Sequence, residues 1–332
     1  SKLAFVGFLG IAAQWVAWRF KIPAIVLLLL AGLAAGPLTG YLDPATDLGA
    51  IYKPLIALAV SIILFEGGLT LKWSEIHETS KAVRRIIIFG GPMVWLGSAL
   101  SAHYVGGLEW PTATILGAVL VVTGPAVIMP LLRTAKLSPR PASLLRWEAI
   151  VNDPIGAMFA VLAFETYLIF FAHTPDTLAH GANSFVLLAI AAFFFAIVGG
   201  YALARLLVAA FTRGLVPEYL KAPVMVILVV AAFAISDLML EESGLLTVTV
   251  MGIVIANSRI ASLNEMRRFK ETITVLLVSG VFILLTAALK VETLQSLDWR
   301  AVGFVAMVLF VVRPIAIFIA TIGAGISWQE RL

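Results

Sequence analysis

Residues 146–155 read RWEAIVNDPI and decide the fold, because they place two acidic side chains inside an apolar run from about Ala142 to Ala172. A run of that length can cross a bilayer. An ionisable side chain near the bilayer centre costs about 3 kcal/mol on insertion scales, so such residues are usually kept for a function. Glu148 and Asp153 therefore predict a site inside the membrane.

The two acids face different sides of their helix. Five positions at roughly 100° per residue separate them by about 140° around the axis and by about 7.5 Å along it. Asn152 shares a stripe with Glu148, whereas Asp153 lies on another face. Pro154 lacks an N–H and crowds the preceding turn, so we expect a helix break that frees the carbonyl of Ile150. These groups indicate a cation site, and a packed polar patch is the alternative.

The composition is that of a polytopic membrane protein. Hydrophobic residues make up 61% of the 332 positions and charged residues only 13%, whereas about a quarter of residues are charged in soluble proteins. The chain has no cysteine, which excludes disulfides, thiolate metal sites and cysteine nucleophiles. We expect no cofactor, no metal beyond a transported monovalent ion, and no nucleic acid partner.

Apolar stretches of about 17–25 residues predict membrane-spanning helices. Eleven such stretches cover residues 3–18, 22–38, 54–71, 83–105, 111–132, 142–172, 184–211, 217–240, 243–258, 270–289 and 299–325. Sixteen Lys and Arg residues fall in the odd-numbered loops and three in the even-numbered loops. Because basic loops stay on the cytoplasmic side, we expect the N-terminus outside and the C-terminus in the cytoplasm, in a bacterial inner membrane.

Two other spans carry polar or helix-breaking residues at a similar depth. Asp153 lies about 16 Å into its span, and Glu66 lies about 18 Å from the outer end of the third span. In the fifth span, Thr123, Gly124 and Pro125 interrupt the helix. Transporters use such breaks to present carbonyls and half-helix dipoles to an ion. A simple kink is the alternative.

Charges in two further places need partners. Glu148 and Arg313 each lie about 9 Å from the cytoplasmic face, which predicts an ion pair between the sixth and eleventh spans. The alternative is that Arg313 snorkels or binds the carbonyl end of a helix. Asp237, Glu241 and Glu242 form an outer acidic cluster, either a solvated rim or a vestibule that attracts cations.

This combination of motifs resembles the Asn-Asp branch of the monovalent cation/proton antiporters, which includes prokaryotic sodium/proton antiporters and eukaryotic exchangers. The motifs are ExxxND at 148–153, FEGGL at 65–69, TGP at 123–125 and RP at 313–314. The resemblance covers essentially the whole chain. It implies an all-α fold of two inverted six-helix repeats with broken crossing helices. It also implies a homodimer in the lipid bilayer and elevator-like motion of a core.

The same resemblance implies a division of the chain and roles for its residues. Residues 1–172 would form the first repeat, 173–216 a linker helix, and 217–332 the first four helices of a truncated second repeat. Asp153 would bind the cation and the proton. Asn152, Glu66 and Thr123 would contribute to the ion site.

The resemblance also implies Glu148 and Arg313 as the structural ion pair of the core, and electroneutral exchange. Two departures affect the ion site. Gly124 stands where the family usually has aspartate in Thr-Asp-Pro, and Ala149 stands where serine is frequent. Sodium is the expected ion, and potassium, whose dehydration costs less, is the alternative.

The mechanism that follows is competition at one carboxylate. Asp153 can hold a proton or a cation, and alternating exposure converts this exclusion into exchange that serves pH homeostasis. A cation channel is one rival, and it would need an open filter lined by carbonyls or carboxylates. An intramembrane aspartyl protease using Asp153 and Asp237 is another, but that chemistry needs two acids at one depth. We therefore expect a transporter and not an enzyme.

Overall fold

The computed structural model describes residues 2–73, 80–124, 128, 132, 137–168, 175–240, 242–258, 263–295 and 297–324. Every regular element within these ranges is a helix. A helix satisfies its own backbone polar groups, which a bilayer core requires of any segment that crosses it. Seven of the described helices are long and apolar enough to cross a membrane, and three shorter apolar helices cover 24–38, 243–256 and 273–287.

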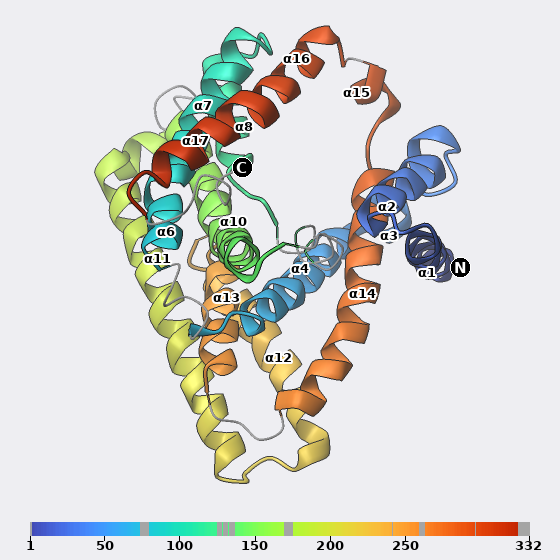
Figure 1. Ribbon diagram of the computed structural model, residues 1–332, viewed down its shortest axis with the longest axis vertical. Coiled ribbons are helices and arrows are strands. Elements are labelled where there is room, and N and C mark those ends of the chain that lie inside the picture. Colours follow the sequence, from blue (N-terminus) through green and yellow to red (C-terminus); the bar gives the residue numbers. More distant parts are fainter. Residues whose placement is uncertain are drawn as a thin grey trace.

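The helices follow one another along the chain as Figure 1 labels them. They are α1 (Lys2–Phe20), α2 (Ala24–Leu33), α3 (Pro44–Leu48), α4 (Tyr52–Leu69), α6 (Ser80–Arg85), α7 (Gly91–Tyr104), α8 (Trp110–Val119), α10 (Pro139–Tyr167), α11 (Pro175–Thr212), α12 (Glu218–Asp237), α13 (Ser243–Ala256), α14 (Leu263–Ala287), α15 (Val291–Gln295), α16 (Trp299–Met307) and α17 (Arg313–Ala320). Within the described ranges, each of the eleven predicted spans contains helix, which confirms the predicted spans as helical segments.

Three spans contain a π-helical turn next to a proline. The turns are η1 (Ala34–Leu38), η3 (Ile86–Gly90) and η5 (Val308–Val312). Pro37 lies inside the first, and a proline opens the helix that follows each of the other two. Proline removes one backbone donor and its ring crowds the carbonyl four residues earlier, so the preceding turn widens. The helix continues directly after η3 and η5, whereas η1 is the last turn of its span.

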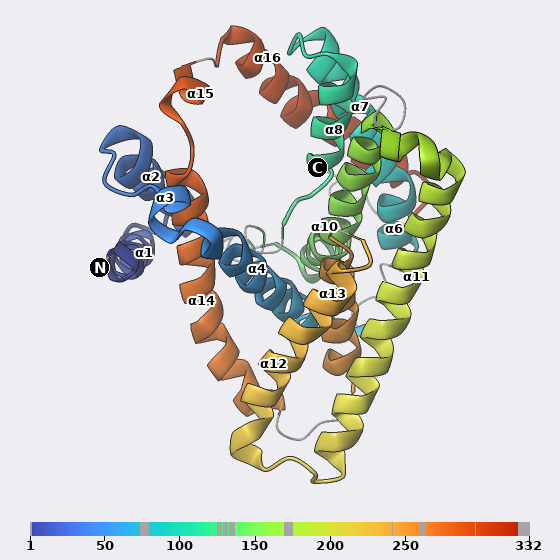
Figure 2. The same cartoon turned by 180° about the vertical axis from the view of Figure 1, so that it is seen from behind.

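Helix α13 lies at the centre of one half of the molecule. Figures 1 and 2 show it among α4, α10, α11 and α12, and it packs against all four. Ten of its fourteen residues are buried. Leu64 and Phe65 of α4 share a buried cluster with Val248 and Met251 of α13. A helix buried all round serves as a scaffold for its neighbours.

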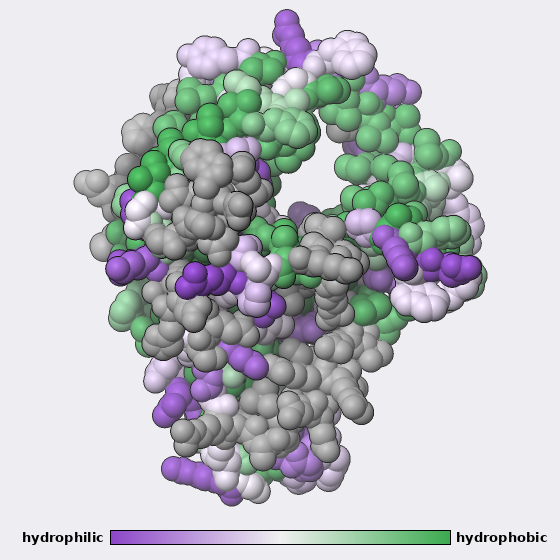
Figure 3. Space-filling view, in the orientation of Figure 1, coloured by the Kyte–Doolittle hydropathy of each residue, from purple (hydrophilic) through white to green (hydrophobic). Residues whose placement is uncertain are grey.

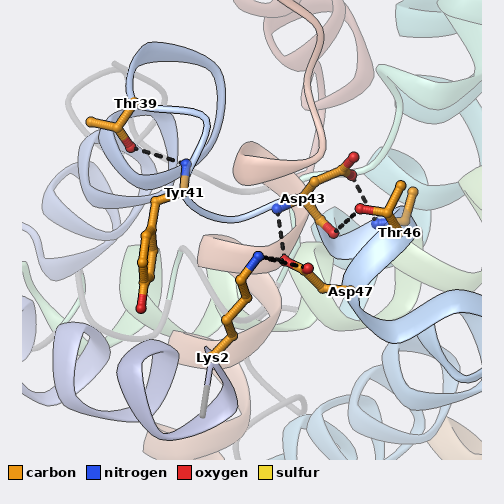
Figure 4. Close-up of polar contacts among 7 residues, drawn as sticks. Lys2, Thr39, Tyr41, Asp43, Thr46 and Asp47 are labelled. Atoms are coloured by element: carbon orange, nitrogen blue, oxygen red, sulfur yellow. Dashed lines mark hydrogen bonds and ion pairs between the residues drawn. The ribbon is translucent and has the colours of Figure 1, made fainter.

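A second group of helices lies to the side of this core. Helix α14 packs against α1 and α2 through a cluster that includes Leu28 and Ile283. Figure 4 shows how the start of α1 is tied to the segment before α4. The Lys2 Nζ atom lies 2.7 Å from Oδ1 of Asp47, and the backbone N–H of Asp43 donates to Oδ2 of Asp47 at 3.0 Å. An exposed pair of this kind contributes about 0–1 kcal/mol, so it orients the end of α1 more than it stabilises it.

The exterior is largely apolar. Figure 3 shows apolar residues over much of the upper part of the visible face, around an opening between α8 and α16 on one side and α2 and α14 on the other. Large side chains such as Trp15, Phe194 and Phe310 are 61%, 61% and 78% exposed. So much exposed apolar surface is abnormal for a protein in water, and a lipid environment accounts for it.

Candidate ion-binding site

Helix α10 carries the two acids of the opening motif and runs without interruption from Pro139 to Tyr167. The predicted break at Pro154 is therefore wrong. A proline inside a long helix removes only the hydrogen bond to the carbonyl four residues earlier, here that of Ile150, and packing on both sides keeps the helix together. Pro154 is buried within α10 and leaves one loosened carbonyl instead of a broken helix.

One stripe of α10 faces the end of α8. Asn152 is only 3% exposed, and its side chain is a hydrogen-bond partner of the Glu148 carboxylate. One turn further, a Cβ atom on Gly156 would lie 2.6 Å from Cγ2 of Val122 and 3.2 Å from its backbone nitrogen. The chain after α8 therefore passes directly over the stripe that carries Asn152.

The fifth span leaves the helix as predicted. Helix α8 ends at Val119, and the next residues make turns before Gly124 adopts a φ of +59°. This left-handed conformation is easy for glycine and strained for other residues. The break at Gly124 is therefore present, whereas Pro125 lies outside the described residues. The Oγ1 atom of Thr123 is buried here without a hydrogen-bond partner.

Arg313 binds the backbone at this break. Its Nη2 atom donates to the carbonyl of Leu120 at 2.7 Å and to the carbonyl of Val122 at 3.3 Å. The last carbonyls of a helix lack partners and carry partial negative charge, so a cation is stabilised there. The guanidinium also attracts the Glu148 carboxylate.

The ion pair of Glu148 with Arg313 therefore needs an amendment. The two charges attract each other, but the hydrogen bonds recorded for Arg313 go to the carbonyls after α8. The alternative to a Glu148–Arg313 ion pair is that Arg313 binds the carbonyl end of a helix. The structure shows these carbonyl bonds, and Arg313 also attracts Glu148 electrostatically. A direct contact between the two side chains stays a prediction.

Asp153 directly follows Asn152 and lies about 100° further around α10. Ala157, one turn later on the same face, packs against the cluster that α4 and α13 supply. Glu66 follows Phe65, a member of that cluster, on α4. Glu66 and Asp153 are each intermediate in exposure, although Oε2 of Glu66 is buried, and Asn152 is buried. Neighbours of both acids in the sequence thus touch one cluster, and a shared site for Glu66 and Asp153 stays a prediction.

Glu242 extends this region toward solvent. It precedes α13 with a φ of +68°, and its N–H donates to Oδ1 of Asp237 at 2.7 Å. Glu242 is exposed, and its charge repels that of Asp153. A vestibule that attracts cations therefore stays a prediction for Glu242, and Glu241 lies outside the described residues.

The family model described as "Sodium/hydrogen exchanger, transmembrane" matches residues 4–332. Na(+)/H(+) antiporter 1 of Methanocaldococcus jannaschii is 25% identical over 98% of this chain and 78% of that protein. The K(+)/H(+) antiporter NhaP of Alkalimonas amylolytica is 25% identical over 98% of this chain and 55% of that protein.

A solved structure has the same fold. The sodium proton antiporter MjNhaP1 from Methanocaldococcus jannaschii at pH 8 superposes with a TM-score of 0.87 at 23% sequence identity. The match covers 99% of this chain and 80% of that one. The helices described above are therefore arranged as in a transport protein.

Proposed function

This chain belongs to the sodium/hydrogen exchanger family, and on that premise we propose that it exchanges a monovalent cation for protons, with Asp153 as the carboxylate that the two ions share. Membership of that family places the chain among transporters rather than enzymes. The proposal concerns which residues carry the exchange and which ion is moved.

One observation carries the proposal. Two buried oxygens, Oδ1 of Asn152 and Oγ1 of Thr123, have no hydrogen-bond partner. Leaving a buried polar group unsatisfied costs about 1–3 kcal/mol. The two atoms come from different elements, α10 and the break after α8, and the packing of Gly156 on Val122 brings these elements together. A dehydrated cation next to Asp153 and Glu66 would use such oxygens as ligands.

The chemistry of the site supports electroneutral exchange. Asn152 is neutral, so Asp153 is the titratable member of the Asn-Asp pair. One monovalent cation or one proton compensates its charge, and the loaded site then carries the same net charge with either ion. Transport of one cation against one proton follows from this competition.

Sodium is the ion that we propose, with potassium as the alternative. Relatives that align over nearly the whole chain include one named a Na(+)/H(+) antiporter and one named a K(+)/H(+) antiporter. Gly124 and Ala149 offer no side-chain oxygen where the family pattern often does. A site with fewer oxygens compensates less of the cost of dehydrating the ion, and because that cost is higher for sodium, these two positions are the reason to keep potassium as the alternative.

Assembly and topology complete the proposal. We propose a homodimer in a bacterial inner membrane, with the N-terminus outside. Residues 1–172 would form the first repeat, 173–216 the linker, and 217–332 would belong to the second repeat. The 38-residue helix α11, from Pro175 to Thr212, supports the linker because it falls wholly within that range.

The test is ion flux in proteoliposomes that contain a pH-sensitive dye. Sodium or potassium added outside vesicles with an acidic lumen should drive proton efflux in the wild type. Asp153→Asn should abolish it, whereas Asp47→Asn, a change in the exposed pair with Lys2, should leave it intact. Retained exchange in Asp153→Asn would refute the assignment. Cation current without coupled proton movement would instead support a channel.

A further inference from the structure

We infer that α13, which contains no acid within its bounds, positions the Glu66 carboxylate relative to Asp153 through Gly252 and Asn257. The inference rests on the proposed function, because it requires that Glu66 take part in ion binding. Gly252 and Asn257 are positioning residues in this account, since they act through α4 and supply no ligand themselves.

The backbones of α4 and α13 touch where the helices cross. A Cβ atom on Gly252 would lie 2.4 Å from the carbonyl oxygen of Phe65 and 3.1 Å from the Cα atom of Gly68. A Cβ atom on Gly68 would lie 2.6 Å from the carbonyl oxygen of Thr249. Backbone atoms cannot move aside as a side chain can, so one added methyl group must shift a helix. The contacts bracket Glu66, because they involve the residue before it and the residue two positions after it.

Asn257 holds the chain where it leaves α4. Its Oδ1 atom accepts from the N–H of Trp73 at 2.7 Å, and its Nδ2 atom donates to the carbonyls of Leu71 at 2.9 Å and Ile253 at 2.7 Å. Leu71 is fully buried, so water cannot replace the lost partner of its carbonyl. The Asn257 side chain, at the end of α13, thus fixes the backbone at Leu71 and Trp73. These residues follow Glu66 in the chain, whereas the Phe65 contact precedes it.

Helix α13 is itself firmly held, as a positioning element must be. A Cβ atom on Gly200 of α11 would lie 2.5 Å from the carbonyl oxygen of Thr247. The Thr247 hydroxyl donates to the hydroxyl of Ser236 on α12 at 2.7 Å. Helices α4, α11, α12 and α13 therefore form one packed unit, and Glu66 takes its position from that unit.

The same attachment reaches α10. Asn257 binds the backbone N–H of Trp73, and the ring of Trp73 lies 5.6 Å from the ring of Trp147, centroid to centroid. Trp147 directly precedes Glu148 in α10 and is buried. Loss of the Asn257 side chain thus loosens the end of α4. It also loosens the contact of Trp73 with Trp147, which joins α4 to α10, the helix that carries Asp153. Both effects change the separation of the two acids.

The experiment measures the cation dependence of proton flux in proteoliposomes for Asn257→Ala, Gly252→Ala and a matched control, Ser258→Ala. The Ser258 hydroxyl donates to the carbonyl of Val254 in its own segment, so its removal leaves α4 untouched. We expect Asn257→Ala to raise the apparent KM for sodium by about tenfold, as loss of a ligand's supporting partner does in metal sites, with kcat within about twofold. Ser258→Ala should keep the wild-type KM.

A double-mutant cycle separates positioning from a general loss of structure. If Asn257 acts through Glu66, then Asn257→Ala should add no further increase in KM in a Glu66→Gln background. Increases in KM that add up in the double variant would overturn the inference. A wild-type KM in folded Asn257→Ala would also overturn it, and this variant alone is sufficient for the test if Gly252→Ala does not fold. If Asn257→Ala has a wild-type KM and Asp153→Asn is inactive, the positioning role of Asn257 is overturned and the proposed function stands. Activity in Asp153→Asn would overturn the proposed function.

Discussion

Replacement of Arg313 by methionine should destabilise the protein mainly through the carbonyls at the end of α8. A hydrogen bond from a charged donor contributes about 1.5–3 kcal/mol. The bond to Leu120 at 2.7 Å counts in full, and the bond to Val122 at 3.3 Å is weak. Loss of one partner of a buried charge pair costs about 3–5 kcal/mol, which is an upper limit here because Arg313 is partly exposed.

We therefore expect Arg313→Met to cost about 3 kcal/mol, which lowers the melting temperature by about 6–12 °C. The control is Arg205→Met on the exposed face of α11, where a surface change should stay within about 0.5 kcal/mol. Thermal unfolding in detergent, followed by size-exclusion chromatography of the folded fraction, compares the two. Equal melting temperatures for Arg313→Met and Arg205→Met would refute the reasoning.

A charge swap tests which partner of Arg313 matters more. Exchanging the two charges keeps the attraction between positions 148 and 313. A glutamate side chain at position 313, however, cannot donate hydrogen bonds to the carbonyls of Leu120 and Val122. The double change Glu148→Arg with Arg313→Glu should therefore remain destabilised. Full recovery of the wild-type melting temperature in the double variant would show that the pair, and not the helix end, governs stability.

The remaining predictions concern the break and the vestibule. Thr123→Val should raise the apparent KM for the cation, because it removes a buried oxygen while keeping the shape of the side chain; an unchanged KM would exclude this oxygen as a ligand. Gly124→Ala should lower the melting temperature, because a φ of +59° costs a residue with a Cβ about 1–2 kcal/mol; an equal melting temperature would contradict the strained turn. Glu242→Gln should raise the KM at low ionic strength and much less at high salt, since salt screens exposed charges; a salt-independent effect would argue against electrostatic attraction.

The depth of each polar residue was predictable, but its direction around the helix axis was not. Rise per residue placed Glu148 and Arg313 at one level, and the structure shows that they attract each other. Whether a guanidinium at that level meets a carboxylate or a carbonyl depends on the rotation of two helices. That rotation is set by packing between distant segments, such as Gly156 on Val122.

Two features show where local rules give way to packing. A proline predicts a helix break from local sterics, yet α10 continues through Pro154, which is buried among its neighbours. Gly252 and Asn257 are visible in the sequence as a small and a polar residue in an apolar segment. Their partners lie on α4 and just after it, far away in the sequence. A local sequence pattern cannot predict such a contact.

The competition at Asp153 can be measured most directly as the apparent KM for sodium in proteoliposomes over a range of pH. A proton and a cation that exclude each other at one carboxylate should raise this KM by about tenfold for each unit of falling pH below the site's ionisation, with an unchanged maximal rate at saturating sodium. A KM that stays constant while the maximal rate falls would place the proton elsewhere, and would contradict the account.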